Sequence, residues 1–214
     1  MMKYPLVIFD WDGTLMDSVA RIVSSMQAAA LECCQAIPSA PAVRDIIGLS
    51  LHKAFPILFG ALTEQEEAAL LAAYRRHYIE LNQTPSPLFA GAAEMIKSLH
   101  QDGYRLAVAT GKQRVGLDRV LADTRLGGYF HALRGADQAL SKPNPLMLEQ
   151  ILTELNLSPA DAVMVGDSSY DLAMAEAIGM DRIGVTYGVH DSAKLCQHTP
   201  VALIDDIRHL RDWL

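Results

Sequence analysis

The sequence predicts an α/β fold, in which a doubly wound parallel sheet carries an inserted all-helical domain. Two observations lead to this prediction. Short, continuous apolar runs alternate with segments of helical periodicity, a pattern typical of parallel strands covered by helices on both faces. Between the first and second of these runs, residues 18–84 show helical periodicity without a buried-strand pattern.

Four apolar runs predict buried parallel strands, and each of them ends in a polar residue. They are LVIFD at 6–10, RLAVAT at 105–110, AVMVGD at 162–167 and RIGVT at 182–186. Two core helices follow from apolar residues at positions i, i+3, i+4 and i+7. One is predicted within 91–103, where Gly103 ends the pattern, and the other within 144–159.

The helical insert begins soon after the first strand. Its pattern runs through SVARIVSSMQAAALECCQ, APAVRDIIGLSLHKAFPILFG and TEQEEAALLAAYRRHYIEL. The following NQTPSPLFAG, with two prolines, predicts a linker that returns to the sheet. We therefore predict a core formed by residues 1–15 and 88–214, with residues 16–87 as the insert.

Composition excludes several classes of partner. The formal net charge is −7 and the pI is near 5.4. Nucleic acids and anionic membranes favour a basic face, so neither is expected as the main partner. The three cysteines lack the spacing of a zinc site or a redox pair, and no signal-peptide or membrane-span pattern is present. The sequence thus predicts a cytoplasmic protein.

Acidic side chains follow two of the predicted strands at the point where each strand ends. Asp10 and Asp12 follow the first strand, and Asp167 and Asp171 follow the third along the chain. Two carboxylates about 4 Å apart repel by roughly 1 kcal/mol in water and by about 4 kcal/mol at an effective dielectric constant near 20. A cation must offset this repulsion where the strand ends meet. Oxygen ligands without a histidine or cysteine cluster indicate Mg²⁺.

Residues suited to holding a phosphoryl group lie in similar places. Thr110 ends the second strand and is followed by Gly111 and Lys112, while Lys142 lies in SKPNP just before a helix. These residues supply a hydroxyl, backbone N–H donors and a cation, which the three charged oxygens of a phosphoryl group require. The combination predicts a site for phosphoryl transfer.

Four segments resemble, in order, the motifs of the haloacid dehalogenase superfamily. DWDGT at 10–14 resembles the first motif, Thr110 the second, Lys142 the third, and GDSSYD at 166–171 the fourth. The core resemblance covers about residues 4–15 and 88–190 and implies a Rossmann-like core. The insert is similar to the C1 cap of phosphoglycolate phosphatases and β-phosphoglucomutases.

This resemblance implies a role for each matched residue. Asp10 would be the nucleophile that forms an aspartyl-phosphate. Asp12 would protonate the leaving alcohol and then activate water, while its backbone carbonyl would bind Mg²⁺. Asp167 would bind Mg²⁺ directly, and Asp171 would orient the ion or a coordinated water.

The remaining matched residues would bind substrate. Thr110 and Lys142 would hold the phosphoryl oxygens, and Lys142 would also offset the charge of Asp10. Two further interpretations stay open in the fourth motif. Asp171 also suits a helix N-terminus, where its charge is favoured, and Ser168 suits a helix cap better than a ligand.

Substrate choice is expected to depend on the insert. VRDIIGLSLHKAF at 43–55 resembles the family's cap loop, which makes Arg44, His52 and Lys53 candidates for contacting a substrate carboxylate or hydroxyl. An exposed helix face is an equally simple explanation for each of them.

The predicted function is a Mg²⁺-dependent phosphatase of a small phosphorylated metabolite, acting as a monomer or homodimer. A phosphomutase of the β-phosphoglucomutase type is the main alternative. Dehalogenases and phosphonoacetaldehyde hydrolases are disfavoured because they usually lack an aspartate at the position of Asp12, although Lys53 could serve the Schiff base of the latter. A non-catalytic binding protein on the same fold is the alternative from another class.

Overall fold

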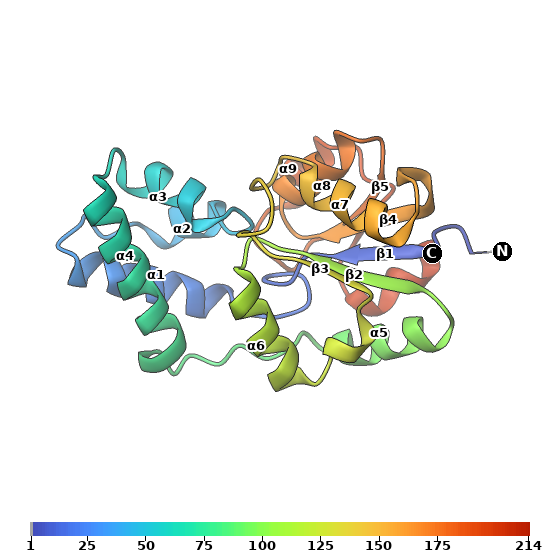
Figure 1. The fold of residues 1–214 in the computed structure, drawn as a ribbon, viewed down its shortest axis with the longest axis horizontal. Helices are drawn as coiled ribbons and strands as arrows, with labels where there is room; N and C mark the ends of the chain where they lie inside the picture. Colours follow the sequence, from blue (N-terminus) through green and yellow to red (C-terminus); the bar gives the residue numbers. More distant parts are fainter. Residues whose placement is uncertain (1) are drawn as a thin grey trace.

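A parallel sheet forms the centre of the right-hand part of the molecule in Figure 1. Its strands are β1 (Leu6–Phe9), β2 (Arg105–Ala109), β3 (Ala132–Arg134), β4 (Ala162–Gly166), β5 (Asp181–Val185) and β6 (Ala202–Ile204). The computed structural model describes residues 2–214, and within this range the strands lie in the order β3-β2-β1-β4-β5-β6. Neighbouring strands pair in parallel throughout that order.

Strand β1 occupies the position that matters most for a site. Leu6 pairs with Arg105 of β2 on one side and with Ala162 of β4 on the other. The order of the strands reverses direction between β1 and β4, and open α/β sheets bind ligands at such a switch point, beyond the carboxyl ends of the strands. The residues that follow β1, β2 and β4 are thereby brought together.

The predicted strands are confirmed as β1, β2, β4 and β5. The sequence does not predict β3 and β6, which form the two edges of the sheet. Each has only three residues, and β3 ends in the half-buried Arg134. So short an edge strand carries too few apolar positions to produce a periodic pattern.

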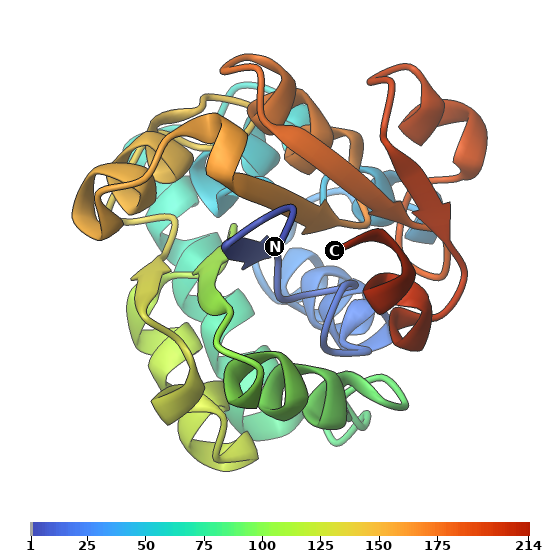
Figure 2. The ribbon, with the colours of Figure 1, turned by 90° about the vertical axis from the view of Figure 1, so that its right-hand side faces the viewer.

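Helices cover both faces of the sheet (Figure 2). They are α5 (Ala92–Gln101), α6 (Arg114–Thr124), η2 (Gly127–Tyr129), α7 (Leu146–Leu155), η3 (Pro159–Asp161), α8 (Ser169–Glu176), α9 (Ser192–Cys196) and η4 (Ile207–Trp213). Val7 and Phe9 of β1 pack in a cluster with α5, α6 and η4, whereas Leu6 and Ile8 pack in another with α7 and α8. This arrangement confirms the doubly wound fold.

The elements between β1 and α5 are all helical. They are α1 (Val19–Glu32), α2 (Ala40–Asp45), α3 (Leu51–Phe59), α4 (Glu64–Arg76) and η1 (His77–Leu81). This helical segment lies on the left in Figure 1 and has its own apolar cluster, which includes Met26, Phe55 and Leu70. No helix in residues 2–214 is both long and apolar enough to cross a membrane.

The chain leaves the sheet and returns to it along two adjacent paths. The N–H of Asp17 donates to the carbonyl of Pro87 at 2.8 Å, and the N–H of Phe89 donates to the carbonyl of Leu15 at 3.0 Å. The predicted boundaries at 15/16 and 87/88 fall in this paired region. The division of the chain into two domains stays a prediction.

The last helix of the segment changes its winding. Helix α4 begins with a capping box, in which Thr63 and Glu66 satisfy each other's backbone N–H groups. It continues directly into η1, a π-helix that the apolar periodicity does not predict. The wider turn carries the buried Tyr78 toward the sheet, and π turns of this kind are frequent at functional sites.

Candidate active site

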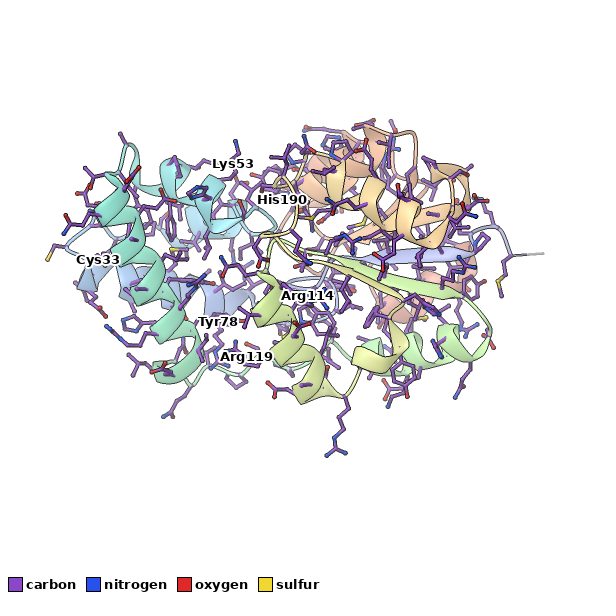
Figure 3. All side chains as sticks on the ribbon, in the orientation of Figure 1. Cys33, Lys53, Tyr78, Arg114, Arg119 and His190 are labelled. Atoms are coloured by element: carbon purple, nitrogen blue, oxygen red, sulfur yellow. The ribbon has the colours of Figure 1, made fainter. Side chains whose placement is uncertain are left out.

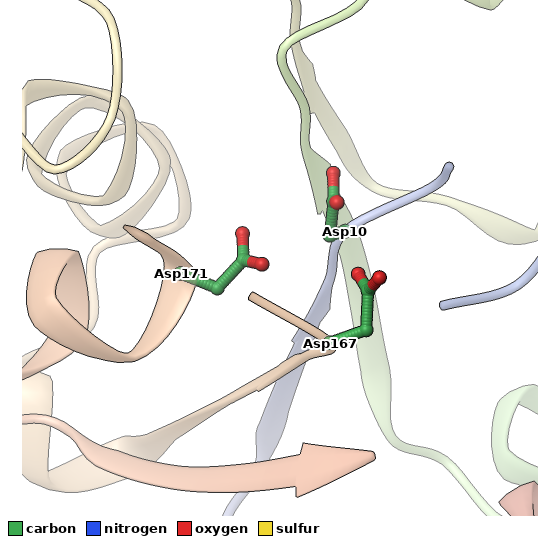
Figure 4. A group of neighbouring side chains, drawn as sticks. All are labelled: Asp10, Asp167 and Asp171. Atoms are coloured by element: carbon green, nitrogen blue, oxygen red, sulfur yellow. The ribbon is translucent and has the colours of Figure 1, made fainter. Parts of the chain in front are cut away.

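Three aspartates meet beyond the carboxyl ends of the central strands (Figure 4). Asp10 follows β1, Asp167 follows β4, and Asp171 lies in the first turn of α8. Each offers a carboxylate oxygen that lies within 4.8 Å of those of the other two, and all three residues are buried. The sheet order thus brings together aspartates that are far apart in the sequence.

Lys142 is buried among these carboxylates. Its Nζ lies 2.8 Å from Asp10 Oδ1 and donates a hydrogen bond to Asp171 Oδ1. Burial lowers the pKa of Lys142, but the charges of Asp10 and Asp171 outweigh this effect and raise it overall. Lys142 is therefore a permanent cation at the base of the site.

Asp171 also determines where α8 begins. Its Oδ2 accepts hydrogen bonds from the N–H and the hydroxyl of Ser168, at 3.1 and 2.6 Å. The hydroxyl of Ser168 in turn accepts from the N–H of Asp171, which completes a capping box. Ser168 is thus a helix cap, as predicted, while Asp171 combines a capping role with its contact to Lys142.

Asp167 is held by one donor on each oxygen. The hydroxyl of Thr14 donates to Oδ1 and the N–H of Val189 donates to Oδ2, both at 2.9 Å. Burial, followed by the charge of Asp10, raises the pKa of Asp167 well above its usual value. Gly13 leaves room for this carboxylate, because its φ is +85° and an added Cβ would lie 2.1 Å from Asp167 Oδ2.

The three carboxylates fit a divalent cation. Asp10 Oδ1 pairs with Lys142 without hydrogen-bond geometry and, within residues 2–214, has no hydrogen-bond donor although it is buried. Burial raises the pKa of Asp10 to about 7, a shift that Lys142 opposes and Asp171 increases. One lysine cannot neutralise three carboxylates, and a hard cation with oxygen ligands would favour their ionised form. The donor set therefore suits Mg²⁺.

Asp12 has different surroundings from Asp10. It is 8% exposed, and Ser18 Oγ donates to its Oδ1 at 2.6 Å while Lys112 Nζ lies 2.9 Å from its Oδ2. The ammonium of Lys112 also lies 4.9 Å from the ring centre of Tyr78 in η1. Burial lowers the pKa of Lys112, but Asp12 outweighs it and raises the value overall.

The sequence indicates Lys112 only as part of the loop suited to a phosphoryl group and gives no role to Ser18; it does not predict the contact of either residue with Asp12. The signal for Lys112 is its place two residues after Thr110, in the loop that follows β2. Thr110 is buried, and its hydroxyl accepts a hydrogen bond from the N–H of Lys112 at 3.2 Å. Ser18 carries no such signal, because a serine before a helix is most simply a cap.

Gly111 lies where the helical segment touches the sheet side of the site. A Cβ at this position would lie 2.6 Å from the carbonyl oxygen of Gly48 and 2.7 Å from that of Leu49. The Ser50 N–H also donates to Ser141 Oγ, close to Lys142 in the chain, at 2.9 Å. These contacts fix residues 48–50 over the strand ends.

A cavity of about 270 Å³ lies between the helical segment and the strand ends, and Asp10, Asp12, Thr110 and Gly111 contribute to its wall. The structure does not bring Arg44, His52 or Lys53 into this wall. All three lie on the surface outside the cavity. Arg44 and Lys53 are exposed, and His52 pairs with Glu67. Figure 3 shows Lys53 on the outer side of the helical segment, whereas Tyr78 and Arg119 lie between the two parts. The geometry therefore does not favour the prediction that substrate contacts Arg44, His52 or Lys53.

The comparison with known families agrees with this geometry. The family model described as haloacid dehalogenase-like hydrolase matches residues 7–185, which include Asp10, Thr110, Lys142 and Asp167. The chain is a haloacid dehalogenase-like hydrolase. The predicted family and the prediction of an enzyme of this superfamily are confirmed.

The similarity to individual relatives covers nearly the whole length of this hydrolase. It is similar to the probable phosphatase IndB of Dickeya dadantii (strain 3937), with 38% identity over 205 residues that cover 94% of this chain and 89% of IndB. It is 33% identical over 209 residues to the tyrosine-protein kinase PtkA of Mycobacterium tuberculosis (strain ATCC 25618 / H37Rv), covering 95% of this chain and 71% of PtkA. The crystal structure of a predicted phosphoglycolate phosphatase from Haemophilus somnus 129pt superposes with a TM-score of 0.88 at 25% identity, covering 99% of this chain and 98% of that one.

Proposed function

We propose that this hydrolase is a Mg²⁺-dependent phosphatase that cleaves a small phosphomonoester through an aspartyl-phosphate on Asp10. The observation that carries the proposal is the buried cluster of Asp10, Asp167 and Asp171, in which the ammonium of Lys142 contacts Asp10 and Asp171. The family and the similarity to IndB and to a phosphoglycolate phosphatase structure support it.

In this proposal the two aspartates of the first motif divide the work. Asp10 attacks phosphorus and the bond to the leaving oxygen breaks, while Asp12 gives that oxygen a proton and the alcohol departs. Asp12, now ionised, takes a proton from a water that attacks the aspartyl-phosphate. Phosphate leaves, and both aspartates return to their starting states. Ser18 and Lys112 hold Asp12 at the cavity wall when its carboxylate is ionised.

The other residues would balance the negative charges of the carboxylates and of the phosphoryl group. Asp10, Asp167, Asp171 and the backbone carbonyl of Asp12 would hold Mg²⁺, which neutralises charge on the phosphoryl oxygens when bound. Lys142 offsets the charge of Asp10, and burial excludes water from the attacking oxygen. Thr110 and the N–H of Gly111 would bind the phosphoryl group.

A turnover assay tests the proposal. Release of p-nitrophenol from p-nitrophenyl phosphate should require Mg²⁺, should stop with EDTA and should be absent in Asp10→Asn, because an amide does not attack phosphorus. Equal rates in Asp10→Asn and the parent would overturn the role of Asp10. No metal-dependent release in the parent would favour a non-catalytic binding protein. Glucose 6-phosphate formed from glucose 1-phosphate, in place of free phosphate, would indicate the mutase.

We also infer that the enzyme works in the cytoplasm on a small phosphorylated metabolite, as a monomer or homodimer. Cys33, Cys34 and Cys196 are free thiols, as expected in a reducing compartment.

A further inference from the structure

The cavity beside Asp10 and Asp12 has two chemically different walls. The strand-end side carries charged and polar groups, among them Thr110, Lys112 and Gln113. On the helical side, Arg75 is the charged residue of the lining, and its guanidinium donates to Gln113 Oε1. The rest of that side is glycine, aliphatic side chains and two tyrosines.

Two aromatic rings belong to the helical side. Tyr74 of α4 and Tyr78 of η1 are stacked, with ring centres 5.8 Å apart and an angle of 30° between the rings. Around them, Ile22, Met26 and Ile46 contribute apolar surface. A phosphomonoester whose phosphorus lies at Asp10 would place its leaving group against this wall.

Two apolar side chains reach solvent from the cavity lining, beside the exposed Arg75 and the half-buried Arg119. Ile79 and Val115 belong to its lining and are still 48% and 73% exposed. They come from different parts of the fold, η1 and α6. Two large apolar side chains exposed at the edge of one cavity extend its apolar surface to solvent, and contiguous apolar surface of this kind marks ligand sites.

We propose that the substrate is a phosphomonoester of an apolar, ring-sized alcohol; this inference rests on the phosphatase function proposed above. A sugar would lose hydrogen bonds to water for each hydroxyl that enters, and the helical wall offers few partners in return. An apolar ring gains contact area with the same wall. The cavity volume of about 270 Å³ is close to the lower end of small-ligand sites and suits a single ring.

A pair of substrates with the same shape tests this inference. Cyclohexylmethyl phosphate and glucose 6-phosphate both attach a six-membered ring to phosphate through one CH₂ group, and both release a primary alcohol. The ring oxygen and hydroxyls make glucose the more acidic leaving group, so a preference for cyclohexylmethyl phosphate cannot come from the acidity of the leaving alcohol. We expect cyclohexylmethyl phosphate to be favoured by at least about 10-fold.

A substitution at the cavity edge links the preference to this wall. Ile79→Asn should reduce the ratio of the two kcat/KM values by about 10-fold or more, because it places an amide beside the ring. Ile57→Asn is the matched control: Ile57 is 62% exposed on α3 of the same helical segment and lies outside the lining. It should leave the ratio unchanged, and circular dichroism should show both variants folded.

The outcomes separate the two proposals. If neither ester nor p-nitrophenyl phosphate is hydrolysed with Mg²⁺, the phosphatase function itself fails. If glucose 6-phosphate is cleaved as efficiently as cyclohexylmethyl phosphate or better, the phosphatase function stands and the apolar substrate class is wrong. Equal loss of preference in Ile79→Asn and Ile57→Asn would show that the cavity edge does not determine selectivity.

Discussion

Asp10 and Asp12 lie two residues apart, yet the fold gives their carboxylates different tasks. Asp10 is buried, and its Oδ1 lies 2.8 Å from the ammonium of Lys142. Asp12 is slightly exposed and is held by Ser18 and Lys112 at the cavity wall. These surroundings suit the proposed roles, in which Asp10 attacks phosphorus and Asp12 moves a proton.

Replacing Asp12 separates proton transfer from metal binding. Asp12→Asn should lower kcat by about 10²- to 10⁴-fold, because an amide cannot protonate the leaving alcohol. Mg²⁺ affinity should be retained, since the proposed ligand at this position is the backbone carbonyl. Isothermal titration and steady-state kinetics measure the two effects. Asp17→Asn, an exposed aspartate nearby in the chain, is the control. Loss of Mg²⁺ binding in Asp12→Asn would contradict the assignment.

At the scale of elements, the sequence predicts what is long and buried. The central strands are recognisable because their apolar runs are continuous, and the aspartates that end them indicate the site. The edge strands β3 and β6 are too short for such a pattern. The π-helix η1 is also not predictable, because widening one turn changes which side chains face inward without changing residue type.

The cavity wall is the part of the site that sequence reasoning could least predict. Arg44, His52 and Lys53 attract attention because they are polar, but their side chains lie outside the cavity lining. The residues that do line it, such as Met26 and Tyr78, resemble ordinary core residues in a sequence. Only the packing of the helical segment on the strand ends shows that they also face a cavity.

The contact between Gly111 and residues 48–49 tests how the helical segment is seated on the core. Gly111→Ala should raise KM more than it lowers kcat, because an added Cβ meets two backbone carbonyls that cannot rotate away. Overpacking of this kind costs about 1–3 kcal/mol. Gly128→Ala is the control, since a Cβ there has no neighbour within 4 Å. Unchanged KM in Gly111→Ala would show that the contact is not needed for substrate binding.

His190 links α8 to the helical segment and gives stability a pH dependence. It is 4% exposed, and its Nδ1 accepts a hydrogen bond from the N–H of Ser169 at 2.9 Å. Asp45, Lys194 and Tyr170 surround the ring. Burial, followed by the charge of Lys194, lowers the pKa of His190 below its usual 6.5.

The direction of this pH dependence follows from the proton that His190 binds in the unfolded chain. Below the usual pKa of 6.5 the unfolded chain binds a proton at His190 that the folded protein does not, so stability falls as the pH decreases. In urea with EDTA, the change in stability from about pH 7.5 to about pH 5.5 should be less favourable for the parent than for His190→Asn, because the aspartates of the site titrate alike in both proteins. An asparagine can still accept from Ser169 but does not titrate. The exposed His52→Asn is the control and should behave like the parent. An equal change in His190→Asn would contradict this account.

At the scale of the whole molecule, the buried charges of the site lower the stability of the metal-free fold. The protein carries a net charge of −7 and gathers three buried carboxylates around one lysine at the junction of its sheet and its helical segment. Burial raises the pKa of Asp10 and Asp167, which means that their ionised forms destabilise the fold when no cation is present. A bound Mg²⁺ should reverse this cost.

Metal removal tests this balance in a scan of thermal unfolding. Saturation at about 100 times the Kd stabilises by about 2.7 kcal/mol, which corresponds to an increase in Tm of roughly 5–10 °C for a protein of this size. EDTA should remove the increase. Asp167→Asn should abolish the response to Mg²⁺ and, in EDTA, should unfold at the same temperature as the parent or higher, because it removes a buried charge. Asp205→Asn, whose side chain is 83% exposed, should respond to Mg²⁺ like the parent. A full Mg²⁺ response in Asp167→Asn would mean that the carboxylate of Asp167 does not bind the ion. A Tm in EDTA well below that of the parent would mean that this carboxylate does not destabilise the metal-free fold.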